Sequence, residues 1–359
     1  MLKKLQGSLW IILLAGLLSA VLLAGCGKGA DSGKPAAEEA KELNLFIWSE
    51  YIPQSVIDKF EKKYGIKVNY TTYSSNEEML AKLAAGASQY DLSVATDYMV
   101  EILRKKDMAQ PIDLGNVPNF KNIGDEFKNT AVDPGNKYTV PYMWGAVPIA
   151  VNTEKVKHPI TSYKDLWSPE FENSLVVLDD QRAIIGAALK KLGYSLNETD
   201  PAKLEQAKEE LKKLMPNIKA FDSDSPKTLL INGEAKAALV WGAEVSLAVR
   251  DNPNIKVVFP TEGMYLWQDN FFIPKDAPHK KAAELFINFI LEPDISAEIS
   301  KAFPYANPNL EAHKLIDQAI LNDPAVYPPK EELAKGEHLK DVGEATAIYD
   351  RIWSEVKQR

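Results

Sequence analysis

Short apolar segments alternate with helix-like segments over residues 43–106. The segments 43–48, 66–70 and 90–95 have the length and composition of strands. Apolar residues recur at helical spacing in the intervening segments, and Gly65 stands where the first helix should stop. Strands and helices that alternate with short connections are typical of a parallel α/β sheet. We therefore predict an α/β fold.

Aromatic and acidic residues gather at the ends of the predicted strands. In parallel sheets, ligands bind in the crevice at the carboxyl ends of the strands. The residues of this kind are Trp48, Glu50, Tyr51, Asp97, Tyr98, Asp180, Trp241, Trp267 and Asp269. The segment Tyr73-Ser-Ser-Asn76 follows the second strand at the same predicted edge.

This combination of side chains suits an organic cation. Aromatic faces attract ammonium groups, by about 0.5–2 kcal/mol each, and carboxylates accept charge-assisted hydrogen bonds from them. Aromatic walls also bury methylene groups, at about 0.8 kcal/mol each. A crevice lined only by helix N-termini would instead favour anions. A polyamine needs all three contributions, so these strand ends predict a polyamine pocket.

Each residue also has a local, structural interpretation. Glu50 could be a first-turn acid that the helix dipole stabilises, and Asp97 is more easily explained as a helix cap than as a ligand group. Asp179 and Asp180 could form a turn, and Trp241 and Trp267 could only pack domains together. The gathering of so many such residues at one predicted edge favours a site.

The N-terminal segment resembles a bacterial lipoprotein signal. Two lysines precede an apolar run that ends in Leu23-Ala-Gly-Cys26, which is similar to the lipobox motif. We expect residues 1–25 to be a signal peptide and Cys26 to carry lipid. Residues 26–42 are small, polar and charged and predict a flexible tether. The mature protein is thus expected outside the cytoplasm, anchored to the cell membrane.

Composition excludes several functions. The chain has a formal net charge of −8. Residues 1–25 contain Lys3 and Lys4 and no acid, so the chain without them has a net charge of −10. This negative charge disfavours nucleic acid as a partner. Cys26 is the only cysteine, so no disulfide or cysteine metal site can form within one chain. The four histidines are scattered, and phosphate-loop, nucleophile-elbow and dinucleotide motifs are absent. We expect no enzyme, no cofactor and no metal.

Beyond these patterns, the chain resembles the bacterial spermidine/putrescine-binding proteins of ABC importers. The resemblance covers essentially all of residues 43–359. It is carried by "FIWSEYIP", "YGIKVNYTTYSSNEEMLAKL", "YDLSVATDYMV", "VPYMWGAVPIAVN", "SYKDLWSPEF", "KKLGYSLNETDP", "LKKLMPN", "INFILEPD", "YANPN" and "DVGEATAIYD".

The resemblance implies a two-lobed, type II periplasmic-binding fold, each lobe a mixed, mainly parallel sheet flanked by helices, with the ligand between the lobes. Lobe 1 would be residues 43–143 plus 270–304, and lobe 2 residues 144–269 plus 305–359. Carried over by motif, the ligand-binding residues would be Trp48, Ser49, Glu50, Tyr51, Thr96, Tyr98, Asp180, Ser223, Trp241, Trp267, Asp269 and Tyr305. We expect Asp269 and Glu50 to hold opposite amines.

Two positions depart from the pattern of the spermidine binders. Ala183 stands where they carry a glutamate, and Leu339 stands where they carry a glutamine. Glu244, three residues after Trp241, could compensate. The choice among spermidine, putrescine and another cation therefore stays open.

We thus expect a monomeric, lipid-anchored protein that delivers polyamines to an ABC permease driven by a cytoplasmic ATPase. The same fold could instead bind an iron complex, thiamine, an amino acid or a sugar, or serve as a sensor or adhesion lipoprotein. A hydrolase using Asp179 and Asp180 lacks any nucleophile–base pattern.

Overall fold

The computed structural model describes residues 40–86 and 89–358, and Ala40–Arg359 forms one compact unit. The predicted signal peptide, Cys26 and nearly all of the predicted tether lie outside the described residues. The first predicted strand begins at Glu42, inside the range expected for the tether.

The first sheet has seven strands, in the order β12-β11-β3-β1-β2, with β4 and β5 both paired to β11. The strands are β1 (Glu42–Trp48), β2 (Lys67–Tyr73), β3 (Leu92–Thr96), β4 (Ala109–Gln110), β5 (Thr139–Val147), β11 (Tyr265–Pro274) and β12 (Glu337–His338). β1 pairs in parallel with β2 and β3, as the alternating pattern predicted. Their carboxyl ends therefore meet at one edge.

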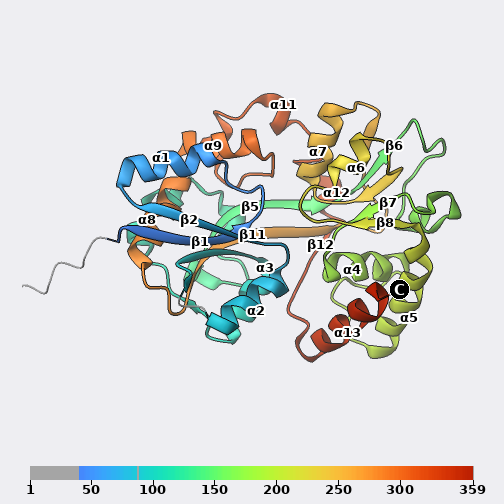
Figure 1. Cartoon of the computed structure of the whole chain (residues 1–359), viewed down its shortest axis with the longest axis horizontal. Helices are drawn as coiled ribbons and strands as arrows, with labels where there is room; N and C mark the ends of the chain where they lie inside the picture. The colour runs from blue at the N-terminus through green and yellow to red at the C-terminus, as the bar shows by residue number, and fades with distance from the viewer. Residues whose placement is uncertain (1–39, 87–88, 359) are drawn as a thin grey trace, which may run out of the picture. The chain divides into compact units, whose positions relative to one another are not determined.

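Helices cover both faces of this sheet (Figure 1). α1 (Gln54–Tyr64) and α9 (Pro293–Ala302) lie on one side, and α2 (Asn76–Gly86) and α3 (Asp97–Lys105) on the other. α1 buries Val56, Ile57 and Phe60, and it ends at Gly65, whose φ of 67° suits the left-handed conformation that glycine adopts without strain. α8 (Lys280–Ile290) packs Phe286 against Phe60, with ring centroids 4.8 Å apart.

The second sheet has five strands, in the order β10-β6-β9-β7-β8. They are β6 (Ile149–Asn152), β7 (Leu175–Val177), β8 (Ile218–Phe221), β9 (Ala237–Leu239) and β10 (Ile255–Val258). α6 (Lys227–Ile231) and α7 (Gly242–Asp251) lie on one side, and α4 (Gln181–Lys191), α5 (Pro201–Leu214) and the C-terminal α13 (Thr346–Lys357) on the other (Figure 1). The short helices α10 (Leu310–His313), α11 (Gln318–Leu321) and α12 (Lys330–Leu333) complete the chain.

The two sheets are mixed, as predicted, and antiparallel pairings are as frequent as parallel ones. The antiparallel share is large because β11 runs against β3, β4 and β5. β5 continues through Pro148 directly into β6 of the second sheet, and the chain returns to the first sheet between β10 and β11. The lobe boundaries implied by the resemblance stay a prediction.

Candidate ligand-binding site

One cavity brings together strand ends from both sheets. It encloses about 520 Å³ of empty space, part of it open to solvent. From the first sheet it is lined by Trp48, Ser49, Glu50, Tyr51, Ser74 and Thr96. From β11, the second sheet and the segment after α9 it is lined by Ser223, Asp224, Trp241, Trp267, Asp269 and Tyr305. Ten of the twelve predicted residues therefore surround one space.

Strand pairing explains why distant residues meet here. Trp48 lies opposite Tyr73 across the parallel β1–β2 pair, which puts Ser74 beside the segment that follows Trp48. Asp269 lies opposite Thr96 across the antiparallel β11–β3 pair. Because β11 runs antiparallel to β3, the middle of β11 reaches the edge where β3 ends.

Asp269 is a buried carboxylate, 5% exposed, at the base of the cavity. Its Oδ1 accepts a 2.7 Å hydrogen bond from the Thr96 hydroxyl, and its Oδ2 accepts a 2.8 Å bond from the Tyr51 hydroxyl. Burial raises the pKa of Asp269 to about 7, although both hydrogen bonds lower it. Among the described residues, no lysine, arginine or histidine forms an ion pair with this carboxylate. A bound cation would therefore meet an uncompensated acid.

Aromatic rings form a continuous wall beside Asp269. Trp267 meets Trp241 at 5.9 Å and Tyr305 at 5.6 Å between ring centroids, both edge-to-face, and Tyr305 meets Tyr51 at 5.2 Å. Gly145 of β5 lets the Trp267 indole sit this deep, since a Cβ at that position would lie 2.7 Å from Cζ2 of Trp267. The wall offers apolar surface to methylene groups and π faces to ammonium groups.

Glu50 is already paired with a protein cation. Its Oε2 accepts a 3.1 Å hydrogen bond from Nζ of Lys227, at the start of α6. The same ammonium lies 3.1 Å and 3.3 Å from the two carboxylate oxygens of Glu244. Burial raises the pKa of Glu244, while the Lys227 charge lowers it. Glu244 thus acts on the site through Lys227 and does not line the cavity.

Tyr98 and Asp180 do not line the cavity. The Tyr98 hydroxyl donates a 2.9 Å hydrogen bond to Glu77, and Asp180 caps α4 by accepting a 2.9 Å bond from the backbone N–H of Ala183. The Arg182 guanidinium lies 5.3 Å from the centre of the Tyr98 ring. Both residues therefore belong to a neighbouring buried cluster of charged groups.

Asp97 is not the expected cap. It is the first residue of α3, and Thr96 stands at the N-cap position without a side-chain cap. One oxygen of the Asp97 carboxylate accepts a 2.8 Å hydrogen bond from the Tyr98 backbone N–H, and the other lies 2.6 Å from Nδ1 of His338 in β12. The pairing ties α3 to a strand some 240 positions later, a partner that local sequence does not reveal.

Ala183 and Leu339, the two departures, are both buried, Leu339 with 1% exposure within the hydrophobic core. Asp179 is paired with Lys357 at 2.5 Å, and Asp180 caps a helix, so neither is arranged as a catalytic acid. Within residues 40–86 and 89–358, no group of three or more His, Cys, Asp or Glu side chains could hold a metal ion.

The predicted set omitted Ser74 and Asp224. Oδ1 of Asp224 accepts a 2.5 Å hydrogen bond from the Ser49 hydroxyl, so the pair bridges the first and second sheets. Ser74 was visible as part of the segment after the second strand. Asp224 follows β8 immediately after Asp222 and Ser223, and an acid after a strand was the available signal.

A family model for bacterial extracellular solute-binding proteins matches residues 55–328. The chain belongs to this family of solute-binding proteins. It is 43% identical over 325 residues to the spermidine/putrescine-binding periplasmic protein of Salmonella typhimurium, covering 89% of this chain and 93% of that one. It is 33% identical over 356 residues to a putrescine-binding periplasmic protein of Pseudomonas aeruginosa, covering 94% and 97%.

Solved structures of solute-binding proteins show the same fold. A putative spermidine/putrescine ABC transporter protein from Listeria monocytogenes matches with a TM-score of 0.86 at 34% identity, covering 89% of this chain and 99% of that one. A lipoprotein of Treponema pallidum matches with a TM-score of 0.78 at 32% identity, covering 89% and 100%. The predicted type II periplasmic-binding fold is confirmed.

Family membership also bears on activity and location. Solute-binding proteins of ABC transporters are not enzymes, which confirms the prediction on this point. The family acts outside the cytoplasm. In the part of the chain that the structure describes, no helix has the length and apolar character needed to cross a bilayer.

Proposed function

We propose that this solute-binding protein captures a polyamine, spermidine or putrescine, and delivers it to an ABC permease with a cytoplasmic ATPase. One observation carries the proposal: the buried Asp269 carboxylate lies beside an aromatic wall and faces no protein cation among the described residues. A buried charge without a partner is costly. An ammonium group would supply that partner, and its methylene chain would cover the tryptophans.

The ligand would act by bridging two lobes, 43–143 plus 270–304 and 144–269 plus 305–359. Cavity-lining residues from both sheets support this arrangement. The ligand shifts the equilibrium toward the closed form only by its greater affinity for that form. The permease would then bind the closed, ligand-loaded form of the protein.

We further propose that residues 1–25 are removed and that lipid on Cys26 anchors a monomer to the cell membrane. The Leu-Ala-Gly-Cys motif supports this, and the similar protein of Treponema pallidum is a lipoprotein. Two acyl chains would hold the protein at the membrane far more stably than one.

Calorimetric titration of residues 27–359 with putrescine, spermidine and spermine tests the function. The protein is first unfolded and refolded to remove any ligand carried through purification. Micromolar or tighter binding of one amine is expected, and Asp269→Asn should abolish most of it. If a refolded protein with native circular dichroism gave no heat with any of the three, the polyamine assignment would be lost.

A further inference from the structure

Glu50, one of the three carboxylates that line the cavity, already faces the ammonium group of Lys227. Resting on the proposed polyamine function, we propose that the ligand is a diamine held between Asp269 and Asp224, and that Lys227 sets this preference by occupying Glu50. Asp224 thus takes the role that the sequence suggested for Glu50.

Lys227 behaves as an ammonium built into the site. Its Nζ lies between Glu50, from the segment after β1, and Glu244 of α7, at 3.1 Å from an oxygen of each. The Lys227 side chain is 18% exposed and that of Glu244 is 4% exposed, so this pair is shielded from solvent. These nearby carboxylates raise the pKa of Lys227 against the opposing effect of burial, so the lysine stays charged. The geometry is that expected for a bound amine.

Arg182 is a second buried cation, and it lies near Tyr98 and Asp180, outside the cavity. The guanidinium is 3% exposed, stacks 5.3 Å from the Tyr98 ring and 4.8 Å from the Tyr349 ring, and donates to the Lys340 carbonyl. Its charge lowers the pKa of Asp180, against the stronger opposing effect of burial. The Arg182 charge therefore partly offsets the burial of the acids at this end, and Asp180 does not line the cavity.

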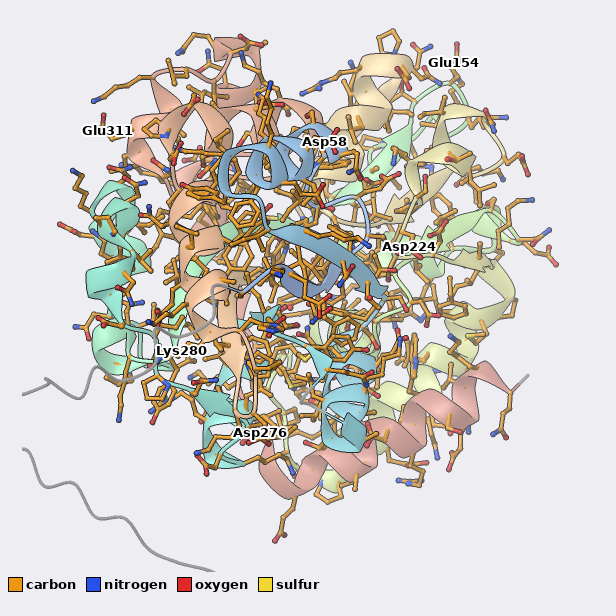
Figure 2. The ribbon with its side chains drawn as sticks, turned by 60° about the vertical axis from the view of Figure 1, so that its left-hand side comes forward. Asp58, Glu154, Asp224, Asp276, Lys280 and Glu311 are labelled. Carbon is orange, nitrogen blue, oxygen red and sulfur yellow. The ribbon has the colours of Figure 1, made fainter. Side chains whose placement is uncertain are left out.

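Two cavity carboxylates remain without a protein cation in the described part of the chain. Asp269 accepts hydrogen bonds from the hydroxyl groups of Tyr51 and Thr96, and Asp224 accepts one from Ser49. Asp224, labelled in Figure 2, lies in the segment after β8 of the second sheet, and Asp269 lies in β11. A ligand with one ammonium at each would join the two sides of the cleft.

Charge balance then limits the number of amines. Two ammonium groups neutralise two free carboxylates, whereas a third would be desolvated without a counter-ion. A triamine could gain a third carboxylate only by displacing Lys227 from Glu50. We therefore expect wild-type protein to bind putrescine more tightly than spermidine.

The test compares putrescine and spermidine by calorimetry on residues 27–359 and variants. Lys227→Met should shift the affinity ratio toward spermidine by about tenfold, equivalent to about 1.4 kcal/mol. Lys227→Arg, which keeps the charge, should retain the wild-type preference. Asp224→Asn should lower putrescine affinity by about tenfold or more, and more than Glu50→Gln does.

The controls are Lys219→Met and Asp276→Asn. Lys219 lies in β8 and pairs with Glu234. Asp276 is an exposed acid that does not line the cavity and lies apart from Asp224 in Figure 2. Both variants should bind as wild type does. Circular dichroism and thermal unfolding of every variant separate a change of preference from a loss of folding.

The outcomes distinguish this inference from the proposed function. If wild type binds an amine but Lys227→Met leaves the ratio unchanged, or Asp224→Asn binds as wild type, the diamine inference is wrong and polyamine binding stands. A wild-type preference for spermidine would also overturn it. If the folded wild type binds neither amine, the proposed function itself fails.

Discussion

The Tyr51 hydroxyl donates a 2.8 Å hydrogen bond to Oδ2 of Asp269, and the two residues stand 218 positions apart in the chain. The bond connects the segment after β1 to the middle of β11. Hydrogen bonds to a charged group contribute about 1.5–3 kcal/mol. This pair therefore sets how readily the carboxylate stays ionised inside the cavity.

Tyr51→Phe should weaken polyamine binding by about tenfold or more, because the carboxylate loses a donor that favours its charged form. Calorimetry at neutral pH measures the change. Tyr138→Phe, whose ring lies near Arg104, is the matched control and should bind normally. If Tyr51→Phe and wild type bound with equal affinity, the Tyr51–Asp269 hydrogen bond would make no contribution to binding.

Binding should depend on pH through Asp269. Since its pKa in the ligand-free protein is about 7, an arriving ammonium must drive off a proton at and below that pH. Affinity should then fall as pH decreases from about 8 to about 5, by up to about tenfold per unit. Titrations in buffers of different ionisation enthalpy count the released proton. If the binding enthalpy at pH 6 were the same in all buffers, that result would contradict the raised pKa of Asp269.

The raised pKa of Asp269 also makes the stability of the ligand-free protein depend on pH. Whereas ligand affinity should fall as pH decreases, this contribution to stability should increase. The pKa of Asp269 is raised from an ordinary value of 3.8 to about 7, so between these values the folded protein holds a proton that the unfolded chain has released. Its contribution to stability is complete below pH 3.8 and declines as pH rises toward 7. Asp269→Asn should therefore flatten this part of the curve of unfolding free energy against pH. A curve identical to wild type would argue against it.

Gly145→Ala should disturb the aromatic wall. The new Cβ would lie 2.7 Å from Cζ2 and 3.0 Å from Cε2 of Trp267, so the indole must move. Overpacking of this kind costs about 1–3 kcal/mol, and polyamine affinity should fall as well. Urea unfolding and calorimetry measure the two effects. Gly86→Ala is the control, because among the residues that the structure describes its Cβ would meet the Gln89 side chain alone, at 3.4 Å.

Replacing Cys26 with alanine should release the protein from the membrane, because no other cysteine can carry the lipid. Fractionation of cells, followed by detection of the protein in membrane and soluble fractions, measures the result. Ser32→Ala, in the same segment, should leave the protein membrane-bound. Membrane retention of Cys26→Ala would overturn lipid anchoring at this residue.

The sequence alone was enough for the parallel strands β1, β2 and β3 of the first sheet and for part of the candidate site. The spacing of apolar residues, together with Gly65 at the end of the first helix, predicted β1, α1 and β2. These patterns could be recognised because they depend only on residues that are near one another in the chain. Parallel strands bring their carboxyl ends to one edge, so residues that directly follow β1 and β3 could be grouped before any contact was known. Trp48, Glu50, Tyr51 and Thr96, which line the cavity, were predicted this way, and the resemblance supplied Ser223 and Tyr305.

Only the tertiary structure decided which carboxylates of the site are paired with a lysine of the protein and which are not. Glu50 and Lys227 stand 177 positions apart, and their ion pair depends on how the two sheets approach and on side-chain rotamers, neither of which is encoded locally. The same holds for the Arg182 guanidinium, which lies 5.3 Å from the centre of the Tyr98 ring although the two residues are far apart in the chain. Residue types at strand ends predict that a cation pocket exists. The number of positive charges that it can accept follows from which carboxylates the fold has already paired.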